Sequence, residues 1–339
     1  MSTAPALPST PPPRFAAVGA GRMGRGIAIA FAYAGHRIAL IDLRQRSPEA
    51  WAGLQAEVAA EIHGSLHGLV QLGALRAEQL DAVAARISLV DAGAAPEALA
   101  AAELLFEGLP ETLEAKREAF EWLNRHCSDD AIITSTTSSM LVTQLAALAR
   151  RPQRFLNMHW LNPAYIIPVV ELSTHPGLGN DVLTRTKALM ESIGKLPVVC
   201  GPTPGYIVPR LQALVMNEAA RMVAEGAATA EEIDKATRYG MGLRFAAIGV
   251  VEFIDFGGVD ILHHASREMS ESIDAARYAA PPIIGQMMQE GRLGLKSGSG
   301  FYDHAGRDAA AYRGDVLTRV LGLLRHAGLW RPPAETTLE

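Results

Sequence analysis

The 339-residue sequence has little of what marks metal-binding, nucleic-acid-binding or membrane-spanning proteins. Its two cysteines, Cys127 and Cys200, form no CxxC motif and no histidines cluster at ligand spacing, so neither a disulfide framework nor a metal site is indicated. Lys and Arg number 31 against 36 Asp and Glu, without a long run of like charge. No signal-peptide pattern opens the chain, and no apolar stretch reaches the roughly 18 residues of a membrane span. We therefore expect a cytoplasmic protein without nucleic-acid or membrane partners.

A glycine motif near the N-terminus is the most informative feature. RFAAVGAGRMGRGIAIAFAYAGHRIALID, residues 14–42, has the order strand, glycine turn, helix, strand and acid. Gly19 allows the tight turn, Gly21 lets the backbone approach a pyrophosphate, and Gly24 lets helix and strand pack closely. The helix N-terminus offers unpaired N–H groups to the anion. Asp42 lies where a carboxylate would bind both ribose hydroxyls of NAD and repel the additional phosphate of NADP.

Two arginines after Asp42 leave an alternative open for the cofactor. Arg44 and Arg46 could accept the 2′-phosphate of NADP, whereas Asp42 favours NAD, which we expect. A glycine motif alone is a weak signal, and its other interpretation is a glycine-rich helix entry with an unrelated aspartate. The complete order of strand, turn, helix, strand and acid favours a dinucleotide site.

Strands and helices continue to alternate after this motif. Apolar spacing predicts a helical pair over residues 48–72 and 76–85, followed by a strand over 87–90. Two further buried strands are expected within 103–111 and 131–139, and the alternation predicts a doubly wound α/β sheet. The second of them ends in consecutive hydroxyl residues. Ligands bind at the carboxyl ends of parallel strands, so these hydroxyls are either functional or caps of the next helix.

A histidine and a glutamate follow apolar runs in NMHWLNPAYIIPVVEL, residues 157–172. We expect short strands over 154–158 and 166–170, which would place His159 and Glu171 at neighbouring strand ends beside the cofactor. A carboxylate on one imidazole nitrogen fixes the tautomer and leaves the other nitrogen to accept a proton. Such a histidine alone would more often be structural. Behind a dinucleotide motif, it suits the base that alcohol oxidation requires.

Several motifs, in this order over about residues 14–303, resemble the L-3-hydroxyacyl-CoA dehydrogenase family. They are GAGRMGRGIA, PET with a following lysine, TTSSM, HWLNP, TPGYIVPR, NEAARMVAEGAATAEEIDKA and LGLKSGSGFYD. The resemblance implies a Rossmann-type NAD domain followed by an all-α C-terminal domain that mediates dimerisation. It also implies a cleft between the domains for a 3-hydroxyacyl substrate.

The resemblance also assigns roles to individual residues. It implies that His159 is the catalytic base, that Glu171 is its partner, and that Ser138 contacts the substrate oxygen. Asn162 and Arg244 complete the expected substrate contacts. The expected cofactor contacts are Gly19, Gly21, Arg22, Met23, Gly24, Asp42, Glu111, Lys116, Ser138 and Asn162.

Two departures from the family pattern bear on the substrate. The family reads IVNR where this chain reads IVPR, so Pro209 supplies neither an amide side chain nor a backbone N–H. GLRFAAIGVVEF is similar to a segment of the gulonate dehydrogenase, lambda-crystallin and carnitine dehydrogenase branches, which act on free hydroxy acids. Its Arg244 either binds a substrate carboxylate or pairs with a protein acid, for which Glu252 and Asp255 are candidates.

The length favours two domains between two tails. We expect a flexible tail over 1–13, an NAD-binding domain over 14–200, a helical substrate and dimerisation domain over 201–327, and a tail over 328–339. The apolar helix that begins after TPG suits a homodimer interface. The loop LGLKSGSGFYD is either a turn or, around Lys296, a phosphate-binding loop, and the lack of a strand-to-helix context favours the turn.

Three functions remain open from the sequence. The first is NAD-dependent oxidation of a short 3-hydroxyacyl-CoA, of 3-hydroxybutyryl type, to the 3-oxoacyl-CoA. The second keeps this chemistry but takes a small free hydroxy acid, gulonate-like or carnitine-like, as substrate. The third is a catalytically silent NAD-binding structural protein. The intact set of Ser138, His159 and Glu171 argues against the third.

Overall fold

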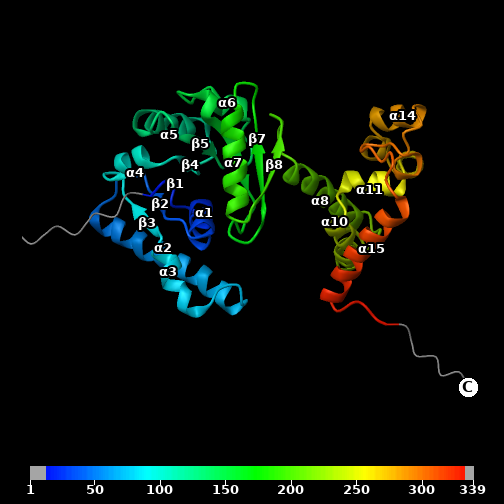
Figure 1. The fold of residues 1–339 in the computed structure, drawn as a ribbon, viewed down its shortest axis with the longest axis horizontal. Coiled ribbons are helices and arrows are strands. Elements are labelled where there is room, and N and C mark those ends of the chain that lie inside the picture. The colour runs from blue at the N-terminus through cyan, green and yellow to red at the C-terminus, as the bar shows by residue number, and fades with distance from the viewer. Residues whose placement is uncertain (1–12, 333–339) are drawn as a thin grey trace, which may run out of the picture. The chain divides into compact units, whose positions relative to one another are not determined.

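The computed structural model of the chain describes residues 13–332 (Figure 1). Of the two expected tails, residues 1–12 and 333–339 lie outside the described part. Contacts divide the chain after Val215 into two compact units, residues 1–215 and 216–339. The division falls inside one helix, α8 (Val208–Ala224). The functional domains expected over 14–200 and 201–327 remain predictions.

The first unit is built on an eight-stranded sheet, in the order β3-β2-β1-β4-β5-β6-β7-β8 (Figure 1). All neighbouring strands are parallel except β6 and β7. The order reverses between β1 and β4, the switch point at which doubly wound sheets bind dinucleotides. The predicted Rossmann-type fold is confirmed. The strands are β1 (Phe15–Val18), β2 (Ile38–Ile41), β3 (Ile87–Val90), β4 (Leu104–Glu107), β5 (Ile132–Ser135), β6 (Phe155–Trp160), β7 (Val169–Ser173) and β8 (Leu196–Cys200).

Helices cover the sheet because the short apolar strands need burial on both faces. Strand β1 shows this, since Phe15 and Ala17 join one hydrophobic cluster while Ala16 and Val18 join another. The helices of this unit are α1 (Arg22–Tyr33), α2 (Pro48–Gln71), α3 (Leu80–Ala84), α4 (Ala95–Ala101), α5 (Leu113–His126), α6 (Val142–Ala146) and α7 (Asn180–Ser192).

The predicted helical pair forms as α2 and α3. Ser47 caps α2 by accepting a hydrogen bond of 3.2 Å from the Ala50 amide. One face of α2 joins the core through residues at helical spacing. Glu57 and Glu61 of α2 also form ion pairs with the buried Arg25 of α1. An amphipathic helix is stabilised mainly by such packing. The buried residues of α2 are Leu54, Val58, Ile62, Leu66 and Leu69.

The strand prediction around the histidine and glutamate was wrong in its bounds. A strand was expected over 166–170, but the amides of Ile166 and Ile167 bond to the Pro163 carbonyl at 3.0 and 2.9 Å, in a turn. A turn that uses these amides leaves none for a sheet ladder, and Pro168 has no amide hydrogen to donate. Strand β7 therefore begins only at Val169.

The second unit is helical, as predicted, with a small core of Val259, Ile284 and Met287. Its LGLKSGSGFYD loop is a turn held by Asp255, which accepts hydrogen bonds from the Phe301 and Tyr302 amides at 3.0 and 2.8 Å. The amino group proposed for a phosphate, on Lys296, pairs with Asp260. The helices are α9 (Ala230–Lys235), α10 (Leu243–Ala247), α11 (Val250–Gly257), α12 (Val259–Ser272), α13 (Ala275–Tyr278), α14 (Pro282–Gln289) and α15 (Ala309–His326).

Residues 13–332 contain neither a membrane-spanning helix nor a metal-binding cluster. None of the helices in this range combines the length and apolar character needed to cross a membrane. No group of three or more His, Cys, Asp or Glu side chains within it could hold a metal ion.

Candidate active site

The glycine turn between β1 and α1 has the geometry expected of a pyrophosphate site. Gly19 has a φ of 110°, which favours glycine, and its amide donates to the Ile41 carbonyl at 2.8 Å. A β-carbon at Gly24 would lie 2.0 Å from the Gly19 carbonyl oxygen, so only glycine lets α1 start this close to the turn. Nothing lies within 4 Å of a β-carbon at Gly21. That open space, beside a helix N-terminus without a side-chain cap, fits the diphosphate of NAD.

The next two residues begin helix α1. Arg22 is exposed and Met23 is half-buried. Their place in the first turn puts their backbone N–H groups among those that an α-helix leaves without intrahelical partners. Both residues are therefore placed to contact an anion through the main chain.

Asp42 follows β2 and is almost fully buried. Its carboxylate accepts a hydrogen bond from Nε of Arg46, four residues further along the same loop, while Arg44 is exposed. The aspartate expected to bind the ribose thus already has a cationic neighbour. The same guanidinium is the one that could meet a 2′-phosphate if the aspartate were absent.

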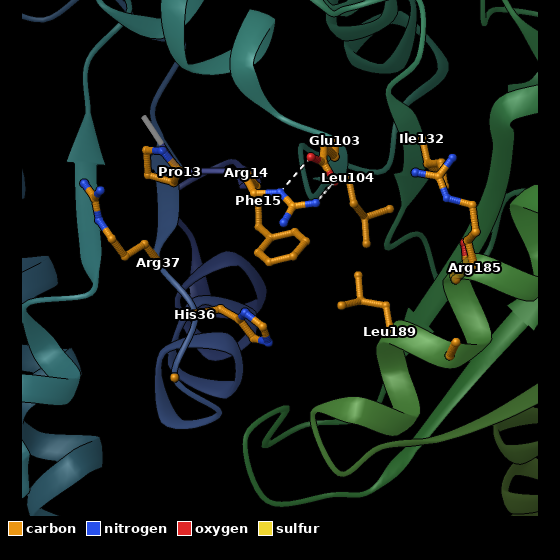
Figure 2. A pocket seen from close by; sticks show the side chains of 13 residues that line it. Pro13, Arg14, Phe15, His36, Arg37, Glu103, Leu104, Ile132, Arg185 and Leu189 are labelled. Carbon is orange, nitrogen blue, oxygen red and sulfur yellow. Dashed lines mark hydrogen bonds and ion pairs between the residues drawn. The ribbon is translucent and has the colours of Figure 1, made fainter. Parts of the chain in front are cut away.

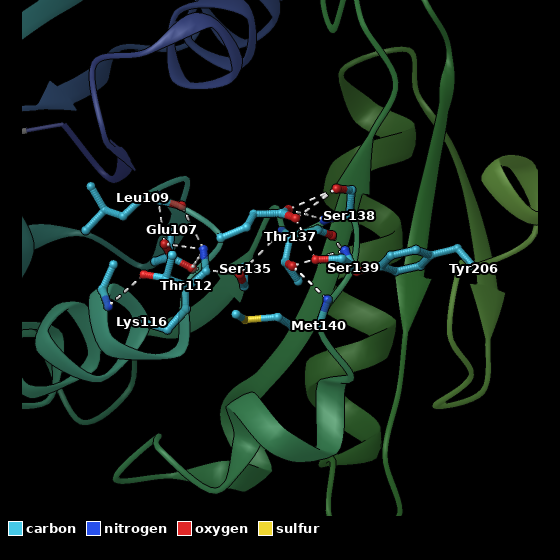
Figure 3. Close-up of polar contacts among 12 residues, drawn as sticks. Glu107, Leu109, Thr112, Lys116, Ser135, Thr137, Ser138, Ser139, Met140 and Tyr206 are labelled. Carbon is cyan, nitrogen blue, oxygen red and sulfur yellow. Dashed lines mark hydrogen bonds and ion pairs between the residues drawn. The ribbon is translucent and has the colours of Figure 1, made fainter.

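A buried ion pair lies behind the loop that follows β4 (Figure 3). Nζ of Lys116 is 2.8 Å from both carboxylate oxygens of Glu107 and 2.9 Å from the Leu109 carbonyl oxygen. Glu107 also accepts from the Ser135 hydroxyl at 2.6 Å. The Lys116 side chain is 1% exposed and its three N–H donors are occupied. Lys116 ties α5 to the end of β4 and to the loop that follows it, while Ser135 joins the same carboxylate from the end of β5. Sequence reasoning missed this link because Glu107, the acid at the end of β4, was not singled out.

Glu111 and Ser138 are both exposed and are joined by hydrogen bonds, and Figure 3 shows Ser138 on the loop after β5. The Ser138 hydroxyl lies 3.0 and 3.1 Å from the two Glu111 carboxylate oxygens, and the Ser138 amide donates to the same group. Ser139 adds a hydroxyl donor at 2.6 Å. Burial alone would raise the pKa of Glu111. The hydrogen bonds from Ser139 and Ser138 lower it by a larger amount, so the net shift is downward. The carboxylate therefore stays ionised and organises the hydroxyl loop.

His159 and Glu171 face each other across two antiparallel strands. The β6–β7 register pairs them directly, and Nδ1 of His159 lies 2.8 Å from Oε2 of Glu171. The expectation that they follow the strand ends was wrong, because β6 continues to Trp160 and β7 begins only at Val169, so both residues lie within the strands. They are 7% and 0% exposed, so water competes little for their hydrogen bond. With Nδ1 occupied, Nε2 is the nitrogen left to exchange a proton.

The other oxygen of Glu171 is also occupied. Oε1 accepts hydrogen bonds from the amides of Ile207 and Val208, at 2.9 and 2.8 Å, where α8 begins. Burial raises the pKa of Glu171, yet the bonds from His159 and from these two amides lower it more, so the net shift is downward. The glutamate is therefore a fixed anion that orients the imidazole.

Tyr206 completes this cluster and was not predicted as a site residue. Its ring stacks on His159, with 4.6 Å between ring centroids and 16° between planes. Its hydroxyl donates to the Thr137 carbonyl at 2.6 Å and accepts from Asn157 at 3.2 Å. TPGYIVPR contained the residue, but a buried aromatic before a helix looks like ordinary core in a sequence.

The side chains of the remaining predicted site residues, Asn162 and Arg244, make no hydrogen bond or ion pair with residues 13–332. Asn162 is exposed after β6, at a cis bond to Pro163. Arg244 is exposed on α10 in the second unit. Its expected internal ion pair does not form among residues 13–332, because Glu252 accepts from the Tyr312 hydroxyl and Asp255 holds the glycine-rich turn. That interpretation of the arginine was wrong.

A cavity of about 670 Å³ lies elsewhere (Figure 2). It includes the first residues of three strands, Phe15, Leu104 and Ile132, and the ion pair between Arg14 and Glu103. Those strands run parallel, so the cavity is at their amino ends. The glycine turn and the Ser138 loop follow the carboxyl ends, and the cavity is therefore separate from the candidate site.

Comparison with known proteins identifies the family. The model of the 3-hydroxyacyl-CoA dehydrogenase NAD-binding domain matches residues 14–203. The chain belongs to the 3-hydroxyacyl-CoA dehydrogenase family. The C-terminal domain model of this family matches residues 205–304. This family member is therefore an NAD-dependent oxidoreductase with a small-molecule substrate, as the sequence predicted.

Three relatives show the range of this similarity. A probable 3-hydroxybutyryl-CoA dehydrogenase of Bacillus subtilis is 31% identical over 286 residues, which are 84% of this chain and 95% of the relative. A 5-formyl-3-hydroxy-2-methylpyridine 4-carboxylate 5-dehydrogenase of Mesorhizobium japonicum is 26% identical over 313 residues, 91% of this chain and 96% of the relative. The crystal structure of a 3-hydroxyacyl-CoA dehydrogenase from Archaeoglobus fulgidus has a TM-score of 0.72 and 27% identity, and the match covers 94% of this chain and all of that one.

Proposed function

We propose that this enzyme oxidises a short-chain L-3-hydroxyacyl-CoA, of 3-hydroxybutyryl type, to the 3-oxoacyl-CoA. The observation that carries the proposal is the buried pair of His159 and Glu171, in which the glutamate is fixed by two backbone amides. The Bacillus relative supports the substrate class. Two free thiols, Cys127 and Cys200, suit the reducing cytoplasm that we include in the proposal.

The side chains divide the chemistry between them. Nε2 of His159 takes the hydroxyl proton, and in the reverse reaction the imidazolium returns it to the carbonyl oxygen. Glu171 holds the tautomer and stabilises the charged imidazole. Ser138 contacts the reacting oxygen, for which its hydroxyl leaves Glu111, and Asn162 lies on the loop after β6. The glycine turn and Asp42 would hold NAD, which would supply the acceptor for the hydride of the carbinol carbon.

The choice of cofactor depends in this proposal on Asp42. Replacing it with Ala should raise the ratio of kcat/KM for NADP over NAD by at least about tenfold, because a like-charge contact with the 2′-phosphate disappears and Arg46 is released. Initial rates with both cofactors measure the ratio. Asp81→Ala, which removes an exposed aspartate of α3, is the control and should leave it unchanged. If the Asp42→Ala variant kept the wild-type ratio of kcat/KM for the two cofactors, Asp42 would not select NAD.

A free hydroxy acid is the second candidate substrate. Arg244 has no acidic partner among residues 13–332, and the Mesorhizobium relative is named for a carboxylate. An exposed guanidinium is available for bidentate pairing with a carboxylate.

Initial rates separate the two substrates. We expect turnover of 3-hydroxybutyryl-CoA and little turnover of gulonate or carnitine. An enzyme that does not oxidise the CoA ester would contradict the proposed 3-hydroxyacyl-CoA substrate. If a free acid is the substrate, Arg244→Leu should raise its KM by about tenfold or more, the effect of a lost charge-assisted pair. Arg238→Leu, which replaces another arginine of this unit, is the matched control.

The proposal also includes a homodimer, formed through the second unit. This unit leaves large apolar side chains exposed on α8, α11 and α12, and exposed apolar surface is typical of protein–protein interfaces. A second copy of the chain would cover them. The residues are Met216, Val223, Val250, Val251 and Ile261.

Sedimentation velocity tests this interface. The double variant Met216→Glu and Val223→Glu places two charges one heptad apart on α8 and should shift the protein from dimer to monomer, because unpaired charges are costly to bury. Leu72→Glu changes an even more exposed apolar residue of the first unit and should sediment as the wild type. A wild-type monomer would contradict the proposal.

A further inference from the structure

Tyr206 has an unusual backbone conformation. Its φ is 47° and that of the preceding Gly205 is 77°, so two successive residues lie in the left-handed region before α8. For a residue other than glycine this conformation is unfavourable and persists only where surrounding contacts impose it. The ring and the hydroxyl of Tyr206 each make such contacts, and each leads to a different part of the candidate site.

The ring controls the plane of the imidazole. The hydrogen bond from Nδ1 of His159 to Glu171 fixes one atom of the ring but still lets the ring tilt about that bond. The parallel stacking of Tyr206, at 4.6 Å and 16°, opposes the tilt. The hydrogen bond to Glu171 and the stacking on Tyr206 together hold the imidazole in one orientation, so Nε2 points in one fixed direction. The electron-rich phenol face also suits the imidazolium that forms when His159 takes a proton.

The hydroxyl anchors the loop that carries Ser138. It donates to the Thr137 carbonyl at 2.6 Å and accepts from Nδ2 of Asn157, which also donates to the Met140 carbonyl at 3.0 Å. Carbonyls on both sides of Ser138 are therefore held, and Figure 3 shows the Tyr206 side chain directed toward this loop. Burial raises the pKa of Tyr206, so the hydroxyl remains a donor at working pH.

We propose that Tyr206 is a positioning residue that sets the imidazole plane of His159 through its ring and the Ser138 loop through its hydroxyl. The inference rests on the function proposed above, in which His159 and Ser138 act on the same substrate oxygen. A single side chain then fixes the position of the proton acceptor relative to the hydroxyl donor. It also connects both to the start of α8, where Glu171 is held.

Two substitutions separate the ring from the hydroxyl. Tyr206→Phe keeps the ring, so kcat for acetoacetyl-CoA reduction should stay within about twofold of the wild type while KM rises about fivefold, the effect of one net hydrogen bond on substrate placement. Tyr206→Leu also removes the ring and should lower kcat about tenfold, because a misplaced catalytic group costs up to about 100-fold. Tyr302→Phe, which changes an exposed tyrosine of the second unit, should match the wild type.

A readout that needs no substrate keeps this test separate from the proposed reaction. Carbethoxylation of His159 by diethyl pyrocarbonate, followed by mass spectrometry, should accelerate several-fold in Tyr206→Leu and remain near the wild-type rate in Tyr206→Phe. NADH affinity, from fluorescence, should be unchanged in both. An inactive wild type with this labelling pattern would contradict the reaction but not the role of the tyrosine. Equal kcat in both variants, no KM rise in Tyr206→Phe, or equal labelling would overturn the inference.

Discussion

His159→Gln is expected to lower kcat for 3-hydroxybutyryl-CoA oxidation by about 100-fold or more, the usual loss when a general base is removed. Glutamine can still donate a hydrogen bond to Glu171, but it offers no nitrogen that takes up a proton near neutral pH. NADH binding should change little, because the glycine turn and Asp42 follow other strands of the sheet, β1 and β2. Steady-state kinetics and NADH fluorescence measure the two effects separately.

A matched control tests whether the loss is specific. His67 is an exposed histidine on α2, so His67→Gln makes the same chemical change away from the β6–β7 pair and should retain wild-type kcat. Normal turnover by His159→Gln would remove the histidine from the proposed reaction. A loss of NADH binding equal to the loss of kcat would instead indicate a disturbed fold.

Glu171→Gln is expected to lower kcat by about 100-fold as well, and to destabilise the protein by about 1–3 kcal/mol. The two carboxylate oxygens accept three hydrogen bonds, from His159, Ile207 and Val208. Glutamine has one carbonyl oxygen, and its NH₂ group must face either the imidazole N–H or the two amides. The buried NH₂ group then faces another N–H donor. Either the hydrogen bond that fixes the His159 tautomer or the two hydrogen bonds from the amides at the start of α8 are lost.

The destabilisation should depend on pH in a defined direction. The pKa of Glu171 is lowered in the folded state, so its contribution to stability is complete above the unfolded value of about 4.3 and is lost as pH falls through the folded pKa. Thermal unfolding should therefore show a gap between wild type and Glu171→Gln at neutral pH that narrows in acid. Glu97→Gln, which changes an exposed glutamate of α4, is the control. A gap that widens in acid would contradict the assigned ionisation.

The cofactor half of the site could be predicted from the sequence because its determinants are local. Gly19, Gly24 and Asp42 lie within one strand–turn–helix–strand segment, and each acts through the space or charge of its own position. The order of strands and helices follows from the same periodicity. Residue types and spacing suffice for such features.

The proton-transfer half depends on long-range geometry that the sequence only partly encodes. The pairing of His159 with Glu171 was anticipated, but the antiparallel register that puts them opposite one another depends on where a proline-containing turn releases the chain into β7. The stacking of Tyr206 depends on its backbone conformation. For Arg244, the acids nearby in sequence bond to other groups in the fold. Pairings of this kind are decided by tertiary structure.

Helix α8 gives the acid of the catalytic pair an unusual dependence on distant sequence. Its first amide, that of Val208, donates a hydrogen bond to Glu171, and the helix continues to Ala224, past the point at which the chain divides into two units. A helix transmits axial displacement along its length with little compression. A substitution that shifts α8 along its axis would therefore move the Val208 amide relative to Glu171, and turnover should respond although the substituted position does not line the active site.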